Sequence, residues 1–407
     1  MLFHAGCHML SVLSEKSFRN LFFAQNFSLL GSGLATVAIS LLAYDLTGRN
    51  AALVLSGLFT IKMLVYVIFS PFAGAIADKF DTKKYLIIQD IVRAIAAFGL
   101  IFVSEIWHLY LIIIFIYLST AAFTPIYQST IPKIFKDEAD YTKALSLFRL
   151  AQDMENILSY ALATFLLLFL NYDLLFVGTF IGYFVSALLI SMIVFPFLST
   201  SLSRRENNFY KNLTLGMRKY LGVSELKGLM FLNLAVSAGG SMILVNTIIL
   251  VRASLKLPEI AFSITMLFFG VGCISAAILI PYLSRGITAT LLMLSGSYLL
   301  SVIFVALAFW IMLFDFIWPV LLIAWFFSGF GYTLLLTPMG RVIRKASPVD
   351  EFSQVYSAQF SLSHLCWLFM YPISGYLMTL SGGPMTLLVL AMVIVLSNIV
   401  AAWYLNN

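Results

Sequence analysis

Residues 71–84 of the chain read PFAGAIADKFDTKK and join two long apolar runs. Five of the seven residues from Asp78 to Lys84 are charged, whereas the runs on either side are almost uncharged. The small residues around Gly74 would let the end of one helix approach a neighbouring helix closely. This pattern predicts a short charged hairpin between two membrane helices.

The composition excludes a soluble protein. Of the 407 residues, 61% are hydrophobic and 10% are charged, whereas a soluble domain carries roughly 25% charged residues. The net charge of +6 is better explained by basic loops facing anionic lipid than by nucleic acid binding. We therefore expect a protein embedded in a lipid bilayer, with no nucleic acid partner.

Apolar stretches of sufficient length predict twelve transmembrane helices, because a spanning helix needs about 20 apolar residues. The expected helices are 18–45, 52–77, 84–104, 107–131, 143–170, 173–197, 226–252, 259–283, 287–313, 316–343, 353–380 and 383–405. With the N-terminus inside, only Arg49, Arg252 and Lys256 of the 24 Lys and Arg residues fall in outer loops. The positive-inside rule then predicts that both termini are cytoplasmic.

A polar segment, residues 199–225, divides the chain into two halves. Its apolar residues recur at helical spacing, which predicts an amphipathic helix on the inner leaflet. The halves also share short patterns, since residues 124–125 (TP) recur at 337–338 and residues 140–142 (DYT) at 351–353 (EFS). We predict an all-α membrane protein with six-helix bundles at residues 1–198 and 226–407.

Ionisable residues inside expected membrane helices are costly and therefore mark candidate functional positions. Lys62 could form a structural salt bridge or contact substrate or ions. Asp153 and Glu155 point to nearly opposite sides of one helix, two residues apart, and Arg149 precedes them on it. One acid would pair with Arg149 or Arg93, and the other would carry a proton. His364 could be a packing residue or a titrating one.

Helix-breaking residues gather around central cavities of membrane transporters. Pro125, Pro338 and Pro372 are expected to break three helices, and Gly239 and Gly240 to loosen a fourth. Several polar or aromatic residues in the apolar stretches could line a mostly apolar pocket: Gln25, Asn26, Asn233, Asn246, Tyr332 and Trp367.

No enzyme signature occurs in the sequence. A phosphate-binding loop with its lysine, a zinc-binding histidine pair on a helix and a Gly-x-Ser-x-Gly turn are all missing. The three cysteines, Cys7, Cys273 and Cys366, have no spacing typical of a disulfide framework or a metal site. We expect neither enzymatic activity nor a bound metal or cofactor.

The charged hairpin resembles the loop between helices 2 and 3 of the major facilitator superfamily. That loop has Gly, three residues, Asp, a basic residue and further basic residues. The matching positions are Gly74, Asp78, Lys79, Lys83 and Lys84, and the departures are Phe80, Asp81 and Thr82. The resemblance implies two parallel six-helix repeats and alternating access. It also implies that Asp78 and the matching basic residues form a cytoplasmic charge network that holds the outward-open state. Asp90 and Arg93, three residues apart on the inner half of the next expected helix, are expected to join this network.

Residues 19–22 (RNLF), 28–31 (SLLG) and 44–48 (YDLTG) resemble the first helix of bacterial macrolide-efflux and enterobactin-type exporters. This resemblance implies a monomer in the bacterial cytoplasmic (inner) membrane that exports a small amphipathic or lipophilic molecule, such as a drug, macrolide or siderophore, in exchange for protons. Two departures are residues 156–163, which lack the Gly-Pro motif of antiporters, and Gly31-Ser32-Gly33, where an acid followed by Gly is frequent.

Two alternatives remain open at this point. The same fold could import a small metabolite or let it pass as a uniporter. A membrane receptor or scaffold that transports nothing is the other alternative.

Overall fold

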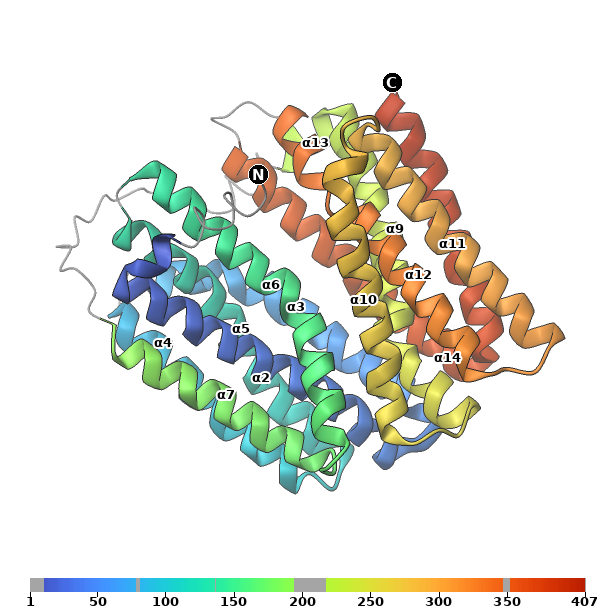
Figure 1. The fold of residues 1–407 in the computed structure, drawn as a ribbon, viewed down its shortest axis with the longest axis horizontal. Coiled ribbons are helices and arrows are strands. Elements are labelled where there is room, and N and C mark those ends of the chain that lie inside the picture. The colour runs from blue at the N-terminus through green and yellow to red at the C-terminus, as the bar shows by residue number, and fades with distance from the viewer. Residues whose placement is uncertain (1–10, 78–80, 136, 194–216, 347–351, 407) are drawn as a thin grey trace. The chain divides into compact units, whose positions relative to one another are not determined.

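The structure is a computed structural model that describes residues 11–77, 81–135, 137–193, 217–346 and 352–406. Within these ranges the regular structure is entirely helical, and no strand occurs among them (Figure 1). Helices are the expected elements of an apolar chain in lipid, because each one satisfies its backbone hydrogen bonds within a single segment.

The chain forms two compact units, which do not divide at a single point of the sequence. The N-terminal unit comprises Met1–Leu42 and Val65–Arg205, and the C-terminal unit comprises Ala43–Leu64 and Glu206–Asn407. Two helices, α2 (Lys16–Thr47) and α3 (Ala51–Ala77), therefore contribute residues to both units. Our prediction of bundles at 1–198 and 226–407 with a linker between them stays a prediction.

Besides its parts of α2 and α3, the N-terminal unit contains α4 (Thr82–Gly99), α5 (Ile106–Ile134), α6 (Glu138–Leu167) and α7 (Asp173–Ser191). Short 3-10 helices lie at Ser11–Ser14 and Leu100–Phe102. Asp81 caps α4, since its side chain accepts hydrogen bonds from the backbone N–H groups of Lys83 and Lys84. An acid suits this position, because a carboxylate stabilises the positive end of a helix.

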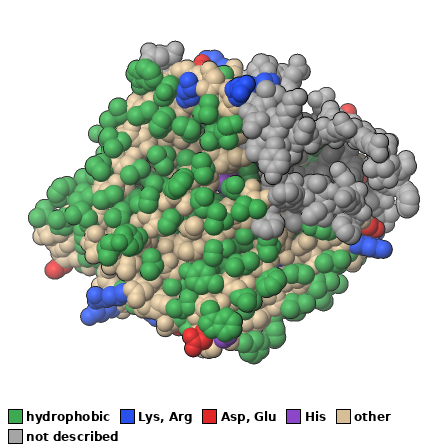
Figure 2. All heavy atoms as spheres, turned by 180° about the vertical axis from the view of Figure 1, so that it is seen from behind, with side chains coloured by type: hydrophobic (Ala, Val, Ile, Leu, Met, Phe, Trp, Pro, Cys, Tyr) green, Lys and Arg blue, Asp and Glu red, His purple; other side chains and the backbone are tan. Residues whose placement is uncertain are grey.

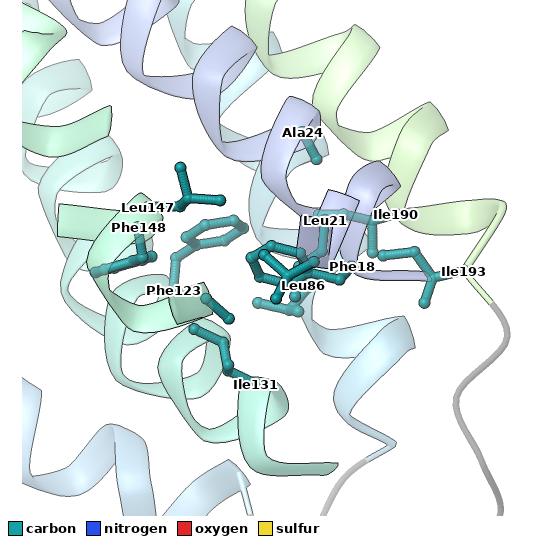
Figure 3. Packing of buried hydrophobic residues seen from close by; sticks show 12 residues of the cluster. Phe18, Leu21, Ala24, Leu86, Phe123, Ile131, Leu147, Phe148, Ile190 and Ile193 are labelled. Atoms are coloured by element: carbon teal, nitrogen blue, oxygen red, sulfur yellow. The ribbon is translucent and has the colours of Figure 1, made fainter. Parts of the chain in front are cut away.

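Apolar side chains from five helices form a core at one end of the N-terminal unit (Figure 3). Phe18 and Leu21 come from α2, Leu86 from α4, Phe123 from α5 and Phe148 from α6. All five are at most 5% exposed. This core fixes the mutual positions of the helices that carry the polar residues described below.

The C-terminal unit is built around α9 (Ser224–Ile248), which continues into a π-helical turn, Ile249–Ser254. The helix α9 packs against α14 (Phe352–Asn406), which contains two helices joined at Gly382, where φ is 75°. The remaining elements are α10 (Glu259–Leu283), α11 (Ala289–Leu313), α12 (Trp318–Leu336) and α13 (Met339–Ala346). The positive φ at position 382 favours glycine, which explains why a glycine joins the two helices of α14.

The expected helix interruptions are found only in part. Pro338 lies between α12 and α13, but the helical backbone continues through Pro125 in α5 and Pro372 in α14, so these two predictions were wrong. A membrane helix tolerates proline where neighbouring groups compensate for the lost hydrogen bond. The helix α9 is likewise uninterrupted at Gly239 and Gly240. These glycines make room for neighbouring side chains instead of loosening the helix.

Eight helical stretches within the described ranges are long and apolar enough to cross a membrane. Two of them, Lys16–Ile68 and Ala358–Leu405, are long enough to contain more than one span. On the face that Figure 2 shows, hydrophobic side chains cover most of the coloured surface, and charged side chains gather near its upper and lower edges. The chain is thus a multi-pass membrane protein, while the exact number of twelve helices stays a prediction.

Candidate functional site

A carboxyl group is hydrogen-bonded inside the N-terminal unit. Glu155 lies on α6, and its Oε1 atom is 2.7 Å from the hydroxyl oxygen of Ser32 on α2. The same hydroxyl oxygen is 2.9 Å from the backbone carbonyl of Leu29. A serine hydroxyl has one hydrogen and can also accept. Ser32 can therefore donate to an ionised Glu155, or accept from a protonated Glu155 while donating to Leu29.

The helices α2 and α6 approach closely at this point. A Cβ atom on Gly33 would lie 1.9 Å from the hydroxyl oxygen of Ser159, one turn beyond Glu155. A Cβ atom on Gly31 would lie 3.1 Å from the backbone oxygen of Thr179 on α7. The Gly31-Ser32-Gly33 sequence thus places a single hydroxyl between two close helix contacts and directs it toward Glu155.

A second polar group in this unit is a buried ion pair. Arg93 and Asp90 on α4 are 3% and 0% exposed and form a salt bridge. Ser186 on α7 donates a hydrogen bond of 2.7 Å to the other oxygen of Asp90. The guanidinium carbon of Arg93 lies 4.2 Å from the ring centre of Phe123 and 4.6 Å from that of Tyr183. Burial of both charges is therefore compensated by an ion pair, a hydroxyl and two aromatic faces.

Tyrosines link the two polar groups of the N-terminal unit. Tyr66 and Tyr183 interact electrostatically with both Glu155 and Arg93. Tyr117 interacts with both of these tyrosines. Hydroxyls of this kind can donate hydrogen bonds to a carboxylate. We name the set Ser32, Tyr66, Asp90, Arg93, Tyr117, Glu155, Tyr183 and Ser186 the acid cluster.

Several predicted site residues lie away from the acid cluster or outside the described parts of the structure. The surroundings of Gly74, the side chains of Arg149 and Asp153 and the whole of Asp78 and Lys79 lie outside the described parts of the structure. Lys83 donates to the backbone oxygen of Ile193 at 2.8 Å, and Lys84 is exposed. The Asn26 side chain donates to the Phe22 carbonyl at 2.7 Å. Gln25 is 4% exposed, and its Oε1 atom has no hydrogen-bond partner among the described residues.

In the C-terminal unit, α9 and the first half of α14 run parallel and share polar contacts. Near one end, the Gln359 side chain donates to Asn233 at 3.1 Å. At the other end, Asn246 donates to the Ser374 hydroxyl at 2.8 Å. Tyr220 precedes α9 and donates its hydroxyl to Gln359. Burial raises the pKa of Tyr220, so this hydroxyl stays protonated at neutral pH.

Between these polar contacts the two helices pack through an aromatic ring. A Cβ atom on Gly240 would lie 2.1 Å from the Trp367 ring. The ring centres of Trp367 and Tyr371 are 5.0 Å apart, and Tyr371 lies 5.2 Å from Phe59 on α3. On the same helix, His364 Nδ1 is 2.7 Å from the Phe360 carbonyl and interacts electrostatically with Lys62. The structure thus brings the predicted residues Lys62, His364 and Trp367 into one region.

A third polar group surrounds Arg252 in the π-helical turn. Its guanidinium nitrogens lie 3.9 Å from Asp45 and 4.0 Å from Glu259, and one donates to the Leu257 carbonyl at 3.1 Å. The guanidinium carbon is 5.2 Å from the ring centre of Tyr44. The predicted pocket residue Tyr332 is elsewhere in this unit and packs edge-on against Phe269.

Sequence reasoning missed the uncharged members of the acid cluster, Ser32, Ser186 and the three tyrosines. A tyrosine in an apolar stretch has no charge that would draw attention to it, and only the folded chain shows which ones meet a carboxylate. The Gly31-Ser32-Gly33 pattern was the available signal, because two glycines around a serine predict close helix contacts. Within the described ranges, no group of three His, Cys, Asp or Glu residues could hold a metal ion.

Comparisons with known proteins agree on the family. A family model described as Major Facilitator Superfamily matches residues 21–314, which is more than half of the chain. Macrolide efflux protein A of Streptococcus pyogenes is 24% identical over 205 residues, covering 49% of this chain and 50% of that protein. The match thus spans only half the length of this relative. The uncharacterized MFS-type transporter YfiS of Bacillus subtilis (strain 168) is 23% identical over 405 residues, covering 95% of this chain and 93% of that protein.

A solved structure has the same fold over nearly its full length. A crystal structure of a mutant of the nucleoside transporter NupG superposes with a TM-score of 0.73 at 12% identity, covering 95% of this chain and 99% of that chain. An identity this low supports the shared fold and carries no substrate information.

Proposed function

The chain belongs to the Major Facilitator Superfamily, and from this premise we propose that it is a secondary active transporter that exports a small amphipathic or lipophilic molecule in exchange for protons. It is a transporter rather than an enzyme. The relative that is a macrolide efflux protein supports the direction and the substrate class. Alternating access, in which the two six-helix bundles expose a binding site to each side of the membrane in turn, is the mechanism that the family's fold suggests.

The Glu155–Ser32 contact carries the proposal of proton coupling. A membrane carboxyl that carries the coupled proton must exist in both protonation states without losing its partners. Ser32 meets this requirement, because its hydroxyl can donate to Glu155 or accept from it, with the Leu29 carbonyl as the alternative acceptor. A proton on Glu155 would change which helix contacts are favourable, and so would shift the balance between conformations.

The test is transport by purified protein in liposomes with an imposed pH gradient and labelled erythromycin as the first substrate. We expect Glu155→Gln to abolish concentrative transport while preserving exchange of labelled for unlabelled substrate, since the amide mimics one protonation state. Asp153→Asn tests the other acid that the sequence places deep in the membrane on this helix. Glu225→Gln, at the start of α9 in the other unit, is the matched control and should transport normally. Concentrative transport by Glu155→Gln at the wild-type rate would place the proton site elsewhere.

The lack of the antiporters' Gly-Pro motif at residues 156–163 favours a second candidate function, the import or uniport of a small metabolite. A uniporter equilibrates its substrate and is insensitive to a protonophore, whereas coupled export stops when the proton gradient is dissipated. Labelled uridine in the same liposomes, with and without protonophore, separates the two functions.

We place the protein as a monomer in a bacterial inner membrane with both termini in the cytoplasm. The distribution of Lys and Arg, of which only three fall in the expected outer loops, supports the orientation of the termini. A reporter fused after Asn407 should be active as a cytosolic probe, and activity as a periplasmic probe would reverse this topology. In this orientation the hairpin at Asp78 and Lys79 faces the cytoplasm, where the family's charge network would act.

A further inference from the structure

The acids on the described membrane helices of the C-terminal unit, Asp45, Glu225 and Glu259, all lie at helix ends, in the last turn of α2 and the first turns of α9 and α10. From residue 226 onward, the acids of the sequence are Glu259, Asp315, Asp350 and Glu351. Glu259 begins α10, and the other three lie in the connections before α12 and α14. The fixed charges that this unit can place in the middle of its helices therefore come from basic side chains.

Two such basic residues, Lys62 and His364, lie together on adjoining helices. The Ala43–Leu64 part of this unit packs antiparallel to α14, with Ser56 against Gly375 and Phe59 against Tyr371. When this antiparallel pairing is continued by one more helical turn beyond Phe59 and Tyr371, Lys62 reaches the level of His364 and Trp367. The electrostatic interaction between Lys62 and His364 agrees with that placement.

Aromatic rings flank these two nitrogen bases. The His364 ring centre lies 3.9 Å from that of Phe360, and the His364 Nδ1 atom is held by the Phe360 carbonyl, which can only accept. The rings of Trp367, Tyr371 and Phe59 lie next to one another farther along the contact between α14 and α3. Lys62, His364 and Trp367 are all partly exposed, in contrast to Asn246 and Ser374 farther along these helices, which are fully buried. We name Phe59, Lys62, His364, Trp367 and Tyr371 the basic aromatic patch.

We propose that the basic aromatic patch binds an amphipathic organic anion, with Lys62 and His364 contacting its acidic group and the ring of Trp367 packing on its apolar body. The buried rings of Phe59 and Tyr371 support Trp367 in this position. Two basic groups side by side repel each other when both are charged, and an anion placed between them removes that repulsion. Lysine also suits this role because its ammonium is a compact charge with three donors on a flexible stem. This inference rests on the proposed transport function, but it names amphipathic acids as the substrate class in place of macrolides, which carry a basic amine.

Binding of three probes of similar shape and different charge tests the proposal. Naphthylacetate is an anion, naphthylacetamide is neutral and naphthylethylamine is a cation, and each is titrated calorimetrically into the full-length protein in lipid nanodiscs. We expect naphthylacetate to bind on the order of tenfold more tightly than the amide, as hydrogen bonds to a charged group predict, and the amine to bind most weakly. Equal or tighter binding of the amine, or no binding of naphthylacetate, would overturn the proposal.

Variants locate the site. Lys62→Gln should lower the affinity for naphthylacetate to that for the amide and leave amide binding unchanged, while Lys62→Arg should keep the preference for the anion. Trp367→Ala should weaken the acetate and the amide equally, because it removes apolar contact and no charge. Lys227→Gln is the matched control, since Lys227 belongs to the same unit but stacks on Tyr404 instead.

Unchanged binding of naphthylacetate by Lys62→Gln would refute the site even if the anion preference holds. If a variant does not fold, the comparison of the three probes on the wild-type protein still decides the substrate class. Because the assay needs no gradient, a failure of proton-coupled export would leave its result unaffected.

Discussion

Replacing Arg93 by Met removes one partner of the buried ion pair in the N-terminal unit. Methionine has a similar length and keeps the apolar part of the contacts with Phe123 and Tyr183. Asp90, which is 0% exposed, would keep only the hydrogen bond from Ser186. The substitution therefore leaves a carboxylate in a place where it can neither be hydrated nor be paired by its present partner.

The expected loss is large because both partners are excluded from water. Removing one member of a buried pair costs roughly 3–5 kcal/mol, since the remaining charge has to be neutralised or left unpaired. Lys143 and Asp140 on α6 form a pair with the same spacing along a helix, but their side chains are 24% and 43% exposed. Lys143→Met should therefore cost about 1 kcal/mol or less.

The assay is the free energy of unfolding in mixed micelles, measured by titration with sodium dodecyl sulfate and followed by tryptophan fluorescence. Adding Asp90→Leu to Arg93→Met should restore most of the loss, because the unpaired carboxylate is then removed as well. A single variant Arg93→Met as stable as Lys143→Met would refute the reasoning. It would show that Asp90 finds another partner or that the pair is hydrated.

Two further substitutions follow from packing and exposure. Gly240→Ala should destabilise the protein by about 1–3 kcal/mol, because its new Cβ atom would overlap the Trp367 ring. Gly222→Ala is the control and should be neutral in the same titration, because no atom lies within 4 Å of its new Cβ atom. Equal effects of the two substitutions would contradict the close contact at Gly240. Arg252→Gln should cost less than about 1 kcal/mol, because its charged contacts are 3.9 and 4.0 Å long and its side chain is 21% exposed; a loss as large as that of Arg93→Met would mean that these contacts are tighter than they are in the structure.

The helical membrane fold could be predicted from the sequence because lipid imposes a simple rule. A run of apolar residues must become a helix, so the length of each run predicts where a helix lies. The same rule says little about proline or glycine inside a run. Pro372 was expected to break its helix and Gly240 to loosen its own, but the outcome at such a residue depends on neighbouring groups. At Gly240 the neighbouring group is the Trp367 ring.

Of the candidate site, the sequence predicted mainly the ionisable residues. Lys62, Glu155 and His364 stood out because ionisable residues are rare in apolar stretches. Their neighbours, such as Ser32 and Tyr371, became evident only once helices distant in sequence were placed side by side. The roles of all these residues remain proposals, and the experiments above address Glu155 and Lys62 directly.

The π-helical turn at Ile249–Ser254 has a consequence for the evolution and engineering of this chain. A π-turn amounts to one residue inserted into an α-helix, and such turns persist chiefly where they serve a function. Deleting a single residue from the turn would restore regular α-helical winding and change which residues of this last turn face Asp45 and Glu259. Arg252 would then lose its alignment with Asp45 and Glu259. The spacing of the chain at this turn, and not only the arginine itself, therefore determines whether these contacts form.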